Sequence, residues 1–342
     1  MSNRWPGGLI RKTPVTPAGP FQNGAAPGVW TLAEASFWTK QGLWPIAGNA
    51  APTMMIFGAY DAVGFNNTIS YVNITTTGND IDFGDLRLTL WTLAAIGSTT
   101  RGIIAGGYGN SSGFSASSSI DFVTFASAGN SANFGILTQS RQSMATCSDQ
   151  TRGVFMGGGQ DNPTAVNTID YVTMASTGNA VTFGLLVVVT NQGTGFDSPT
   201  RGVNFAGDRN ATTARYITIA TTGNAISFGS CGASRDRASF SSSTRGGAAG
   251  GFDGVNVSAI EYVTIATTGN SVNFGNLTLA RYGIVGGSSQ IRGVFAGGST
   301  GSFSNVIDYI TIASTGNALD FGDLASARNS GGGTSNAHGG LN

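Results

Sequence analysis

The sequence is poor in the residues that build disulfide frameworks, metal centres and nucleic-acid surfaces. Its 342 residues include only 2 cysteines and 1 histidine, so we expect neither a disulfide framework nor a metal site. Only 10% of the residues are charged and the formal net charge is zero, which argues against nucleic acid as a partner. Cys147 and Cys231 are interpreted as small buried apolar residues.

Long hydrophobic runs are also missing. The longest apolar patch, residues 185–189, has the length of a strand and not that of a membrane span, so membrane insertion is not expected. Arg4, Arg11 and Lys12 near the amino terminus have no apolar segment behind them, so a secretory signal is not expected either. These features predict synthesis and folding in a cytosol.

Glycine, by contrast, is abundant, with 53 residues, and 40% of the chain is hydrophobic. This composition is typical of many short strands joined by tight turns. A segment around 307–324 has five earlier relatives, and the asparagines that mark the six copies recur every 45 to 51 residues. They are Asn79, Asn130, Asn179, Asn224, Asn270 and Asn317.

Each copy reads as four short strands, a to d. An aromatic lies eight residues before each marker asparagine, in strand c, and a Phe-Gly pair begins four residues after it, in strand d. Residues Thr-Gly-Asn between c and d predict a tight hairpin because they tolerate positive φ. Strand c is apolar on both alternating faces, with Ile169 and Tyr171 on one and Val172 and Met174 on the other. Such a strand needs cover on both sides, as neighbouring propeller blades provide.

The two ends of the array predict how it closes. The first copy begins at strand b, with residues 53–57, and lacks strand a. The last copy continues past strand d and stops at residues 337–340, where another strand b would begin. We therefore predict an all-β fold, a six-bladed β-propeller of four-stranded blades over residues 51–342, in which residues 325–337 pair beside 54–57. Such closure removes free sheet edges.

The repeat resembles the kelch repeat in its arginine after strand d, its glycine pair closing strand b and its aromatics in strands c and d. Its Thr-Gly-Asn variant resembles repeats in virion proteins of marine phages, including cyanophages. The leader is similar to that of marine phage structural and tail-fibre proteins, in the segments Arg4-Trp5-x-Gly-Gly-x-Ile10-x-Lys12, Gly28-Val29-Trp30-x-Leu32 and Gly42-Leu43-Trp44-Pro45. The resemblance implies a virion protein, assembled in the host cytoplasm.

Residues 1–50 form an amino-terminal arm with one helix signal. Thr31 and Glu34 make a capping-box pair, and Gly42 with Pro45 ends the helix. A lone helix of this length is marginal in water, so it must dock, either on the propeller or on a virion partner. The candidate attachment residues are its large aromatics, Trp30, Phe37, Trp38 and Trp44.

No catalytic constellation stands out from the repeat, so we expect a protein that is not an enzyme and uses no cofactor. The repeated arginines are given a structural role, with the acids of strand c, such as Asp170 and Asp308, as partners. His338 occupies the arginine position of the repeat, which gives a Ser-His-Asp site little support. The repeated arginines are Arg101, Arg152, Arg201, Arg245 and Arg292.

Length variation is concentrated in the loops between strands b and c. The interval from each strand d Phe to the next repeated arginine is 17 or 18 residues, whereas the interval that contains the b–c loop ranges from 15 to 21. Variable loops on a rigid scaffold commonly bind ligands, and aromatic rings beside Asn and Asp suit sugars. The candidate receptor-binding residues are Phe65, Asn66, Tyr108, Phe114, Asp161, Asn162, Asp208, Arg209, Phe252, Asp253 and Phe303.

The sequence therefore leads to one functional expectation and two alternatives. We expect a phage tail-fibre, tail-tip or head-appendage module that contacts other virion proteins through its arm, binds a host surface receptor or glycan, and forms homo-oligomers. A structural or decorating virion subunit without receptor affinity is the first alternative. A glycan-processing propeller enzyme is the second.

Overall fold

The computed structural model describes residues 51–109, 115–160, 164–205, 207 and 211–341, together with Thr31, Ala33 and Glu34. The chain divides into two units, Met1–Ala51 and Pro52–Asn342. In the first unit the capping box is present, because Thr31 N donates to Glu34 Oε2 at 2.9 Å and Glu34 N donates to Thr31 Oγ1 at 3.3 Å. Trp30, Phe37, Trp38 and Trp44 lie outside the described residues. None of the described residues belongs to a helix long and apolar enough to cross a bilayer.

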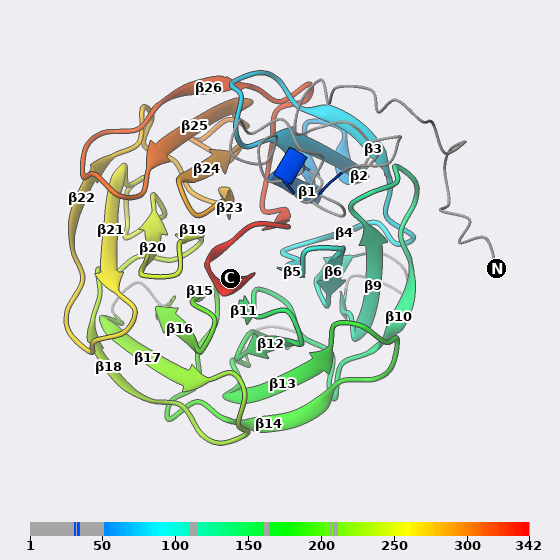
Figure 1. Cartoon of the computed structure of the whole chain (residues 1–342), viewed down its shortest axis with the longest axis vertical. Helices are drawn as coiled ribbons and strands as arrows, with labels where there is room; N and C mark the ends of the chain where they lie inside the picture. The colour runs from blue at the N-terminus through cyan, green and yellow to red at the C-terminus, as the bar shows by residue number, and fades with distance from the viewer. Residues whose placement is uncertain are drawn as a thin grey trace. The chain divides into compact units, whose positions relative to one another are not determined.

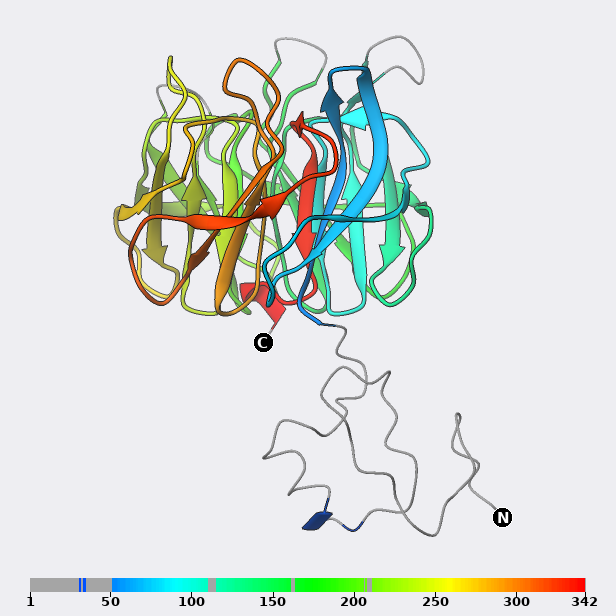
Figure 2. The same cartoon turned by 90° about the horizontal axis from the view of Figure 1, so that it is seen from above.

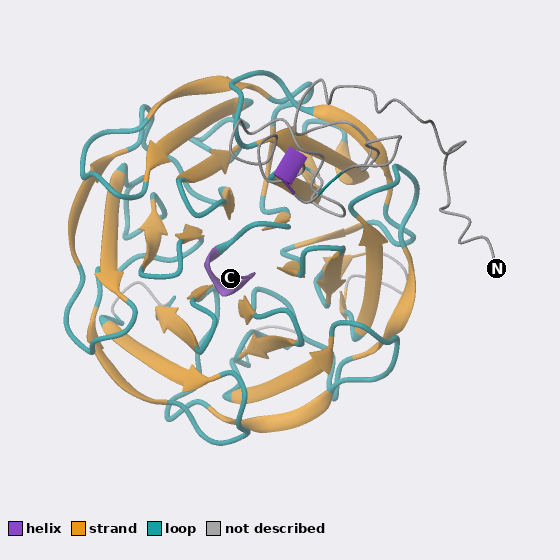
Figure 3. Cartoon of the chain, viewed as in Figure 1, coloured by secondary structure: helices purple, strands orange, loops and turns teal. Residues whose placement is uncertain are grey.

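Six antiparallel sheets surround a central axis, which confirms the six-bladed β-propeller (Figures 1 and 3). Strand a of each blade is innermost and strand b follows it outward. The a strands are β28 (Gly332–Ser335), β5 (Ala94–Gly97), β11 (Ala145–Ser148), β15 (Thr194–Asp197), β19 (Ala238–Ser241) and β23 (Val285–Ser288). The b strands are β1 (Thr53–Asp61), β6 (Arg101–Ala105), β12 (Arg152–Met156), β16 (Arg201–Phe205), β20 (Arg245–Ala249) and β24 (Arg292–Ala296).

Strands c and d complete each blade toward the rim. The c strands are β2 (Gly64–Asn73), β9 (Ser119–Thr124), β13 (Thr168–Thr173), β17 (Thr213–Thr218), β21 (Ala259–Thr264) and β25 (Val306–Thr311). The d strands are β3 (Ile81–Asp85), β10 (Ala132–Ile136), β14 (Val181–Leu185), β18 (Ile226–Ser230), β22 (Val272–Asn276) and β26 (Leu319–Asp323). A small extra sheet joins β4 (Leu90–Trp91), β7 (Tyr108–Gly109) and β8 (Ser115–Ala116).

The hydrophobic core is divided into six clusters, each lying between two adjacent blades. Between the third and fourth blades, for example, Val154 and Phe183 pack with Ile217 and Ile219. Strand c is thus covered on both faces, as its sequence predicts. Cys147 is part of this same cluster, and Cys231 is buried in the next one, so both cysteines pack as small apolar residues.

The repeated Gly-Asn and Phe-Gly pairs meet at joints between blades. Gly223 N donates to Phe183 O at 3.0 Å, and Leu185 N donates to Asn224 Oδ1 at 3.0 Å, so the c–d turn of one blade is tied to strand d of its neighbour. A Cβ on Gly184 would lie 2.1 Å from Gly223 O. The Phe-Gly glycine is therefore required by close approach to the next blade.

Our prediction of positive φ at these turns is confirmed at only two of the six turn glycines, Gly78 and Gly129. None of the marker asparagines has positive φ, and Gly78 and Gly129, with φ of 158° and 156°, are close to extended backbone. The turn is instead held by the hydrogen bonds to the neighbouring blade.

The carboxyl-terminal residues close the ring as predicted. β28 pairs antiparallel with β1, with Ser335 opposite Met54 and Gly332 opposite Phe57. Just before it, β27 (Arg328–Asn329) pairs with the other end of β1. The first blade is therefore built from both ends of the propeller unit, and its strand a comes from the end of the chain.

Candidate functional site

The connection from strand d to the next strand a contains a residue with left-handed backbone in every blade. Five of the six are not glycine, and such a residue costs about 1 to 2 kcal/mol. Backbone hydrogen bonds join neighbouring connections around the axis, for example Ser143 N to Thr92 O at 3.0 Å. We call these six residues the collar. They are, with their φ angles, Thr92 (52°), Ser143 (52°), Gln192 (58°), Asp236 (55°), Gly283 (64°) and Ser330 (57°).

The residue before each collar position lines one common cavity of about 730 Å³, which we call the mouth pocket. This volume lies in the range of about 300–1,000 Å³ typical of ligand sites. The six residues are Trp91, Gln142, Asn191, Arg235, Tyr282 and Asn329. Tyr60 from the end of β1 also lines the pocket, the connections between strands b and c add Tyr108, Ser299, Gly301 and Phe303, and five collar residues complete the lining.

One wall of the mouth pocket is aromatic. Tyr60 contacts three other rings, with centroid distances of 5.3 Å to Phe65, 5.5 Å to Phe303 and 5.8 Å to Trp91. Trp91 in turn lies 6.2 Å from Tyr108. Tyr60 remains 38% exposed despite these contacts. The wall therefore presents a ring that is fixed in place and still accessible.

The rest of the lining is largely polar, and its groups bind one another. Arg235 Nη1 donates to Gln192 Oε1 at 2.9 Å, and Gln192 Nε2 donates to Asp236 Oδ2 at 3.3 Å. Arg235 also lies 3.7 Å from the Asp236 carboxylate. Thr92 Oγ1 donates to Gln142 Oε1 at 3.0 Å. These bonds hold the amide and charged groups in a fixed arrangement around the opening.

The structure brings together only part of the predicted receptor-binding set. Tyr108 and Phe303 lie in the aromatic wall, and Phe65 packs against its Tyr60 without lining the pocket. Phe252 packs beside the pocket, 5.5 Å from the ring of Tyr282. The remaining predicted residues Phe114, Asp161, Asn162, Asp208 and Arg209 lie outside the described residues.

Asn66 and Asp253 have local contacts instead. Asn66 Nδ2 donates to Asp61 Oδ2 at 2.9 Å and its Oδ1 accepts from Thr68 N at 2.6 Å, so its side chain stabilises the β1–β2 hairpin. Asp253 Oδ1 accepts from Val255 N at 3.3 Å in an exposed turn. Neither residue lines the mouth pocket.

Tyr60 and the six residues that precede the collar were not predicted from the sequence. Variation in loop length points to the b–c loops, whereas these six residues lie in an interval of nearly constant length. The available signal was a variation in residue type: Trp91, Gln142, Asn191, Arg235, Tyr282 and Asn329 occupy the same step of the repeat. When the residue type at one position of a repeat varies although the segment around it keeps its length, that position is a candidate for contact with a ligand.

The repeated arginines link blades, but their predicted partners are wrong. The guanidinium of Arg152 lies over the ring of Tyr171, 4.9 Å from its centroid, and Arg152 Nη1 donates to the carbonyl of Ala220 in the next blade at 2.8 Å. Arg101, Arg201, Arg245 and Arg292 make equivalent contacts. They stack on the strand c aromatic and tie adjacent blades together.

Other arginines pair with the strand c acids. Arg141 lies 2.6 Å from Asp170 and Arg281 lies 3.1 Å from Asp308, and all four side chains are fully buried. Burial raises the pKa of Asp308 although the charge of Arg281 opposes this. Arg141 and Arg281 come two residues before the collar, so these pairs anchor the d–a connections to their blades. They are structural groups beneath the mouth pocket.

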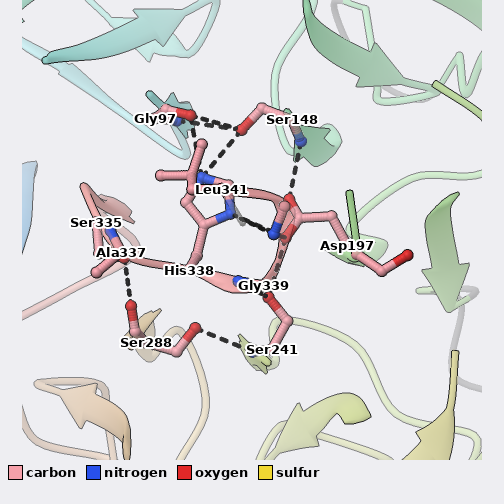
Figure 4. Close-up of polar contacts among 12 residues, drawn as sticks. Gly97, Ser148, Asp197, Ser241, Ser288, Ser335, Ala337, His338, Gly339 and Leu341 are labelled. Carbon is pink, nitrogen blue, oxygen red and sulfur yellow. Dashed lines mark hydrogen bonds and ion pairs between the residues drawn. The ribbon is translucent and has the colours of Figure 1, made fainter. Parts of the chain in front are cut away.

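The sole histidine closes the opposite end of the axis (Figures 2 and 4). His338 Nδ1 lies 2.9 Å from Asp197 Oδ1, and its Nε2 lies 3.0 Å from Gly97 O. Gly339 N, in the short 3₁₀ turn η1 (Gly339–Leu341), donates to Ser241 Oγ at 3.1 Å. The last strand a residue of each blade surrounds this segment: Gly97, Ser148, Asp197, Ser241, Ser288 and Ser335.

His338 lies between Ser148 and Asp197, as the histidine does in a Ser-His-Asp hydrolase triad, but the hydrogen on its Nε2 is in the wrong place for catalysis. His338 Nε2 is 3.3 Å from Ser148 Oγ and 3.0 Å from Gly97 O, and a carbonyl can only accept. Nε2 therefore carries a hydrogen and cannot act as the base toward Ser148, whose Oγ donates to Gly97 O at 2.9 Å. The group seals the axis instead of activating a nucleophile.

No family model matches this chain, and the search of curated proteins found no match. Among solved structures, 327 chains are similar. One of them, described as "Structure of YjhT", is a β-propeller with a TM-score of 0.58 and 10% sequence identity, covering 73% of this chain and 88% of that one. At this identity the similarity supports the fold alone.

Proposed function

We propose that this chain is a structural protein of a phage particle whose propeller binds a receptor on the host cell through the mouth pocket. The mouth pocket is the observation that carries the binding role. Its volume is about 730 Å³, it receives one side chain from every d–a connection, and the collar holds those side chains in place. The resemblance of the repeat and of the leader to marine phage virion proteins supports the location in the particle.

The amino-terminal arm is the attachment segment in this proposal. Its leader carries the phage-like segments, and four large aromatics lie between residues 30 and 44. An aromatic-rich short helix gains most of its stability by docking on a partner. Other virion proteins are the proposed partners.

The chemistry of the mouth pocket favours binding over catalysis. Asp236 is the only Asp or Glu among the described residues that line it. Glycoside hydrolysis generally uses two carboxyl groups on either side of the scissile bond. A glycan-processing enzyme would therefore need a second acid that the lining does not supply.

Adhesion through this pocket calls for several copies. A small site of this kind binds with affinity on the order of millimolar, about 4 kcal/mol. Linking sites raises the overall affinity by about 10²- to 10⁴-fold. Homo-oligomers on the particle are therefore part of the proposal.

The test is binding of a multivalent, fluorescent form of the full chain to a panel of marine bacterial and cyanobacterial strains. We expect Tyr108→Ala/Tyr282→Ala to reduce binding to the susceptible strain at least about tenfold, because aromatic anchors dominate such sites. The matched control is Leu319→Ser, which changes an apolar residue that is 59% exposed on β26 at the rim. Equal binding by both variants, with unchanged melting curves, would leave a decorating subunit without receptor affinity.

A further inference from the structure

The mouth pocket carries almost no uncompensated charge. Arg235 and Asp236 are the only residues with charged side chains among its described lining residues, and they lie 3.7 Å apart. Gln192 binds both, accepting from Arg235 Nη1 and donating to Asp236 Oδ2. For an anionic ligand, the charge of Arg235 is already compensated by Asp236. For a cationic ligand, the charge of Asp236 is already compensated by Arg235.

Tyr60 is suited to stacking against a flat apolar face. Its three aromatic neighbours fix the ring, so little conformational freedom is lost when a ligand covers it. The face of a sugar ring carries C–H groups that pack on aromatic side chains, while its hydroxyls remain available at the edge. An exposed, immobilised tyrosine therefore fits one face of a saccharide.

Polar groups with unused hydrogen-bonding capacity surround this ring. Gln142 accepts from Thr92 through Oε1, and no partner among the described residues is found for its Nε2. Four buried atoms of the lining side chains also have no partner there: Trp91 Nε1, Asn191 Oδ1, Arg235 Nε and Asn329 Oδ1. Buried polar atoms are rarely left unpaired, and the cost is about 1–3 kcal/mol each. Apart from Arg235, these groups are uncharged, and the amides of Gln142, Asn191 and Asn329 are suitable counterparts for hydroxyl groups.

The space beneath the mouth pocket admits only the end of a ligand. The cavity below it, at the next residues of the a strands, measures about 90 Å³, and the one below that about 40 Å³. His338 lines the last of these and is hydrogen bonded to strand ends on both sides. A long chain cannot thread through the axis, so a glycan that reaches below the mouth pocket can do so only with its terminal residue.

We infer that the mouth pocket binds the uncharged terminal sugar of a glycan, with the sugar ring on Tyr60 and its hydroxyls on the surrounding amides. This inference rests on the proposed receptor role of the same pocket and adds the ligand class, its neutrality and its orientation.

The probes are immobilised oligosaccharides ending in glucose, galactose or mannose, together with the sialylated and sulfated forms of the same chains. The multivalent full chain should bind at least one neutral probe and bind its acidic forms more weakly. Tyr60→Phe keeps the ring and should retain binding within about threefold, whereas Tyr60→Ala should lose about tenfold because the stacking face is gone. Stronger binding to acidic probes, or equal binding by the two variants, would overturn the inference.

Asp236→Asn tests the charge argument separately. Asparagine tolerates the left-handed backbone of this collar position, where φ is 55°, so folding should be preserved. The change removes the partner of Arg235, and we expect acidic probes to gain affinity relative to neutral ones. An unchanged ratio in a folded protein would contradict the neutralised pair as the source of selectivity.

The two proposals fail in distinguishable ways. If cells are bound, Tyr108→Ala/Tyr282→Ala abolishes that binding, and no neutral oligosaccharide competes, the receptor role stands and the ligand class is wrong. If the variants bind cells as the parent does, the receptor role itself is wrong.

Discussion

His338 is a single residue whose environment sets a pH dependence. Burial, the largest effect, would lower its pKa, but the charge and hydrogen bond of Asp197, with contributions from Gly97 and Asp149, outweigh burial and raise it. The charged imidazole is therefore favoured in the folded protein. Its contribution to stability is complete below the ordinary pKa of about 6.5 and is lost as the pH rises through the higher folded value.

We predict that the stability advantage of the parent over His338→Gln is larger at about pH 6 than at about pH 9. The measurement is the free energy of unfolding in denaturant for both proteins at both values, which cancels the titration of all other groups. Asp197→Asn should abolish the same pH dependence because it removes the charge that raises the pKa. A difference between parent and His338→Gln that grows with pH would contradict this account.

For individual residues, the sequence indicated that His338 and the repeated arginines belong to the repeat, but it did not predict correctly which residues they contact. The sequence placed His338 at the arginine position of the repeat. It did not predict that His338 turns into the axis, because that turn depends on hydrogen bonds to Asp197 and Gly97 in other blades. It gave the repeated arginines a structural role, but assigned them the acids that Arg141 and Arg281 bind. These partners are set by the three-dimensional arrangement of strands and connections within each blade and between blades, which the spacing of residues along one copy does not contain.

Among the elements, the joint between strand d and the next c–d turn explains the most regular part of the repeat. Gly184 and Gly223 lie against each other across the third and fourth blades, and Asn224 accepts from Leu185 N. The same bonds recur between the other blades, for instance from Asp323 N to Asn79 Oδ1 at 3.0 Å. The Gly-Asn and Phe-Gly pairs are therefore constant because each copy must fit its neighbour.

We predict that Gly184→Ala destabilises the protein by about 2 kcal/mol or more. The added Cβ would lie 2.1 Å from the carbonyl oxygen of Gly223, and forced overpacking costs about 1–3 kcal/mol. Gly223→Ala is the matched control, because a Cβ there meets nothing within 4 Å and should cost less than about 1 kcal/mol. Both are measured by denaturant unfolding, and equal losses would show that the joint is not set by close approach.

The elements themselves were predictable from the sequence, whereas these joints were not. Alternating apolar residues and a fixed period indicate four strands per copy, and strands such as β13 and β14 follow that prediction closely. The c–d turn was predicted from its residue types as an isolated hairpin. Its real geometry depends on a neighbour about 45 residues away, and a short-range pattern does not report such a contact.

In the propeller as a whole, closure creates two different ends of one axis. β28 pairs with β1, and Thr53 N donates to Asn336 Oδ1 at 2.7 Å, so the two ends of the unit are locked together. Beyond this lock the last residues cover the axis around His338, on the face opposite the long β1–β2 hairpin (Figure 2). The mouth pocket at one end has a volume of about 730 Å³, whereas the cavity that His338 lines toward the other end measures about 40 Å³.

The sequence pointed to the face that carries the mouth pocket, but to only a few of the residues that line it. The variable length of the b–c loops points to Tyr108 and Phe303, which line the pocket, and to Phe65, which packs against the ring of Tyr60. The d–a connections have nearly constant length and gave no such signal, although they supply eleven of the lining residues, six before the collar and five in it. Their importance appears only when the ring closes and brings the six connections to one point.

The most direct measurement is oxidative footprinting of the multivalent protein while it is bound to susceptible cells. If the mouth pocket is the receptor site, Tyr60, Trp91 and Tyr282 should be protected from labelling relative to the free protein. Residues on the rim such as Ile226, which is 54% exposed, and Leu319 should be labelled equally in both states. Protection of the rim residues with unchanged labelling of the three mouth aromatics would contradict the account.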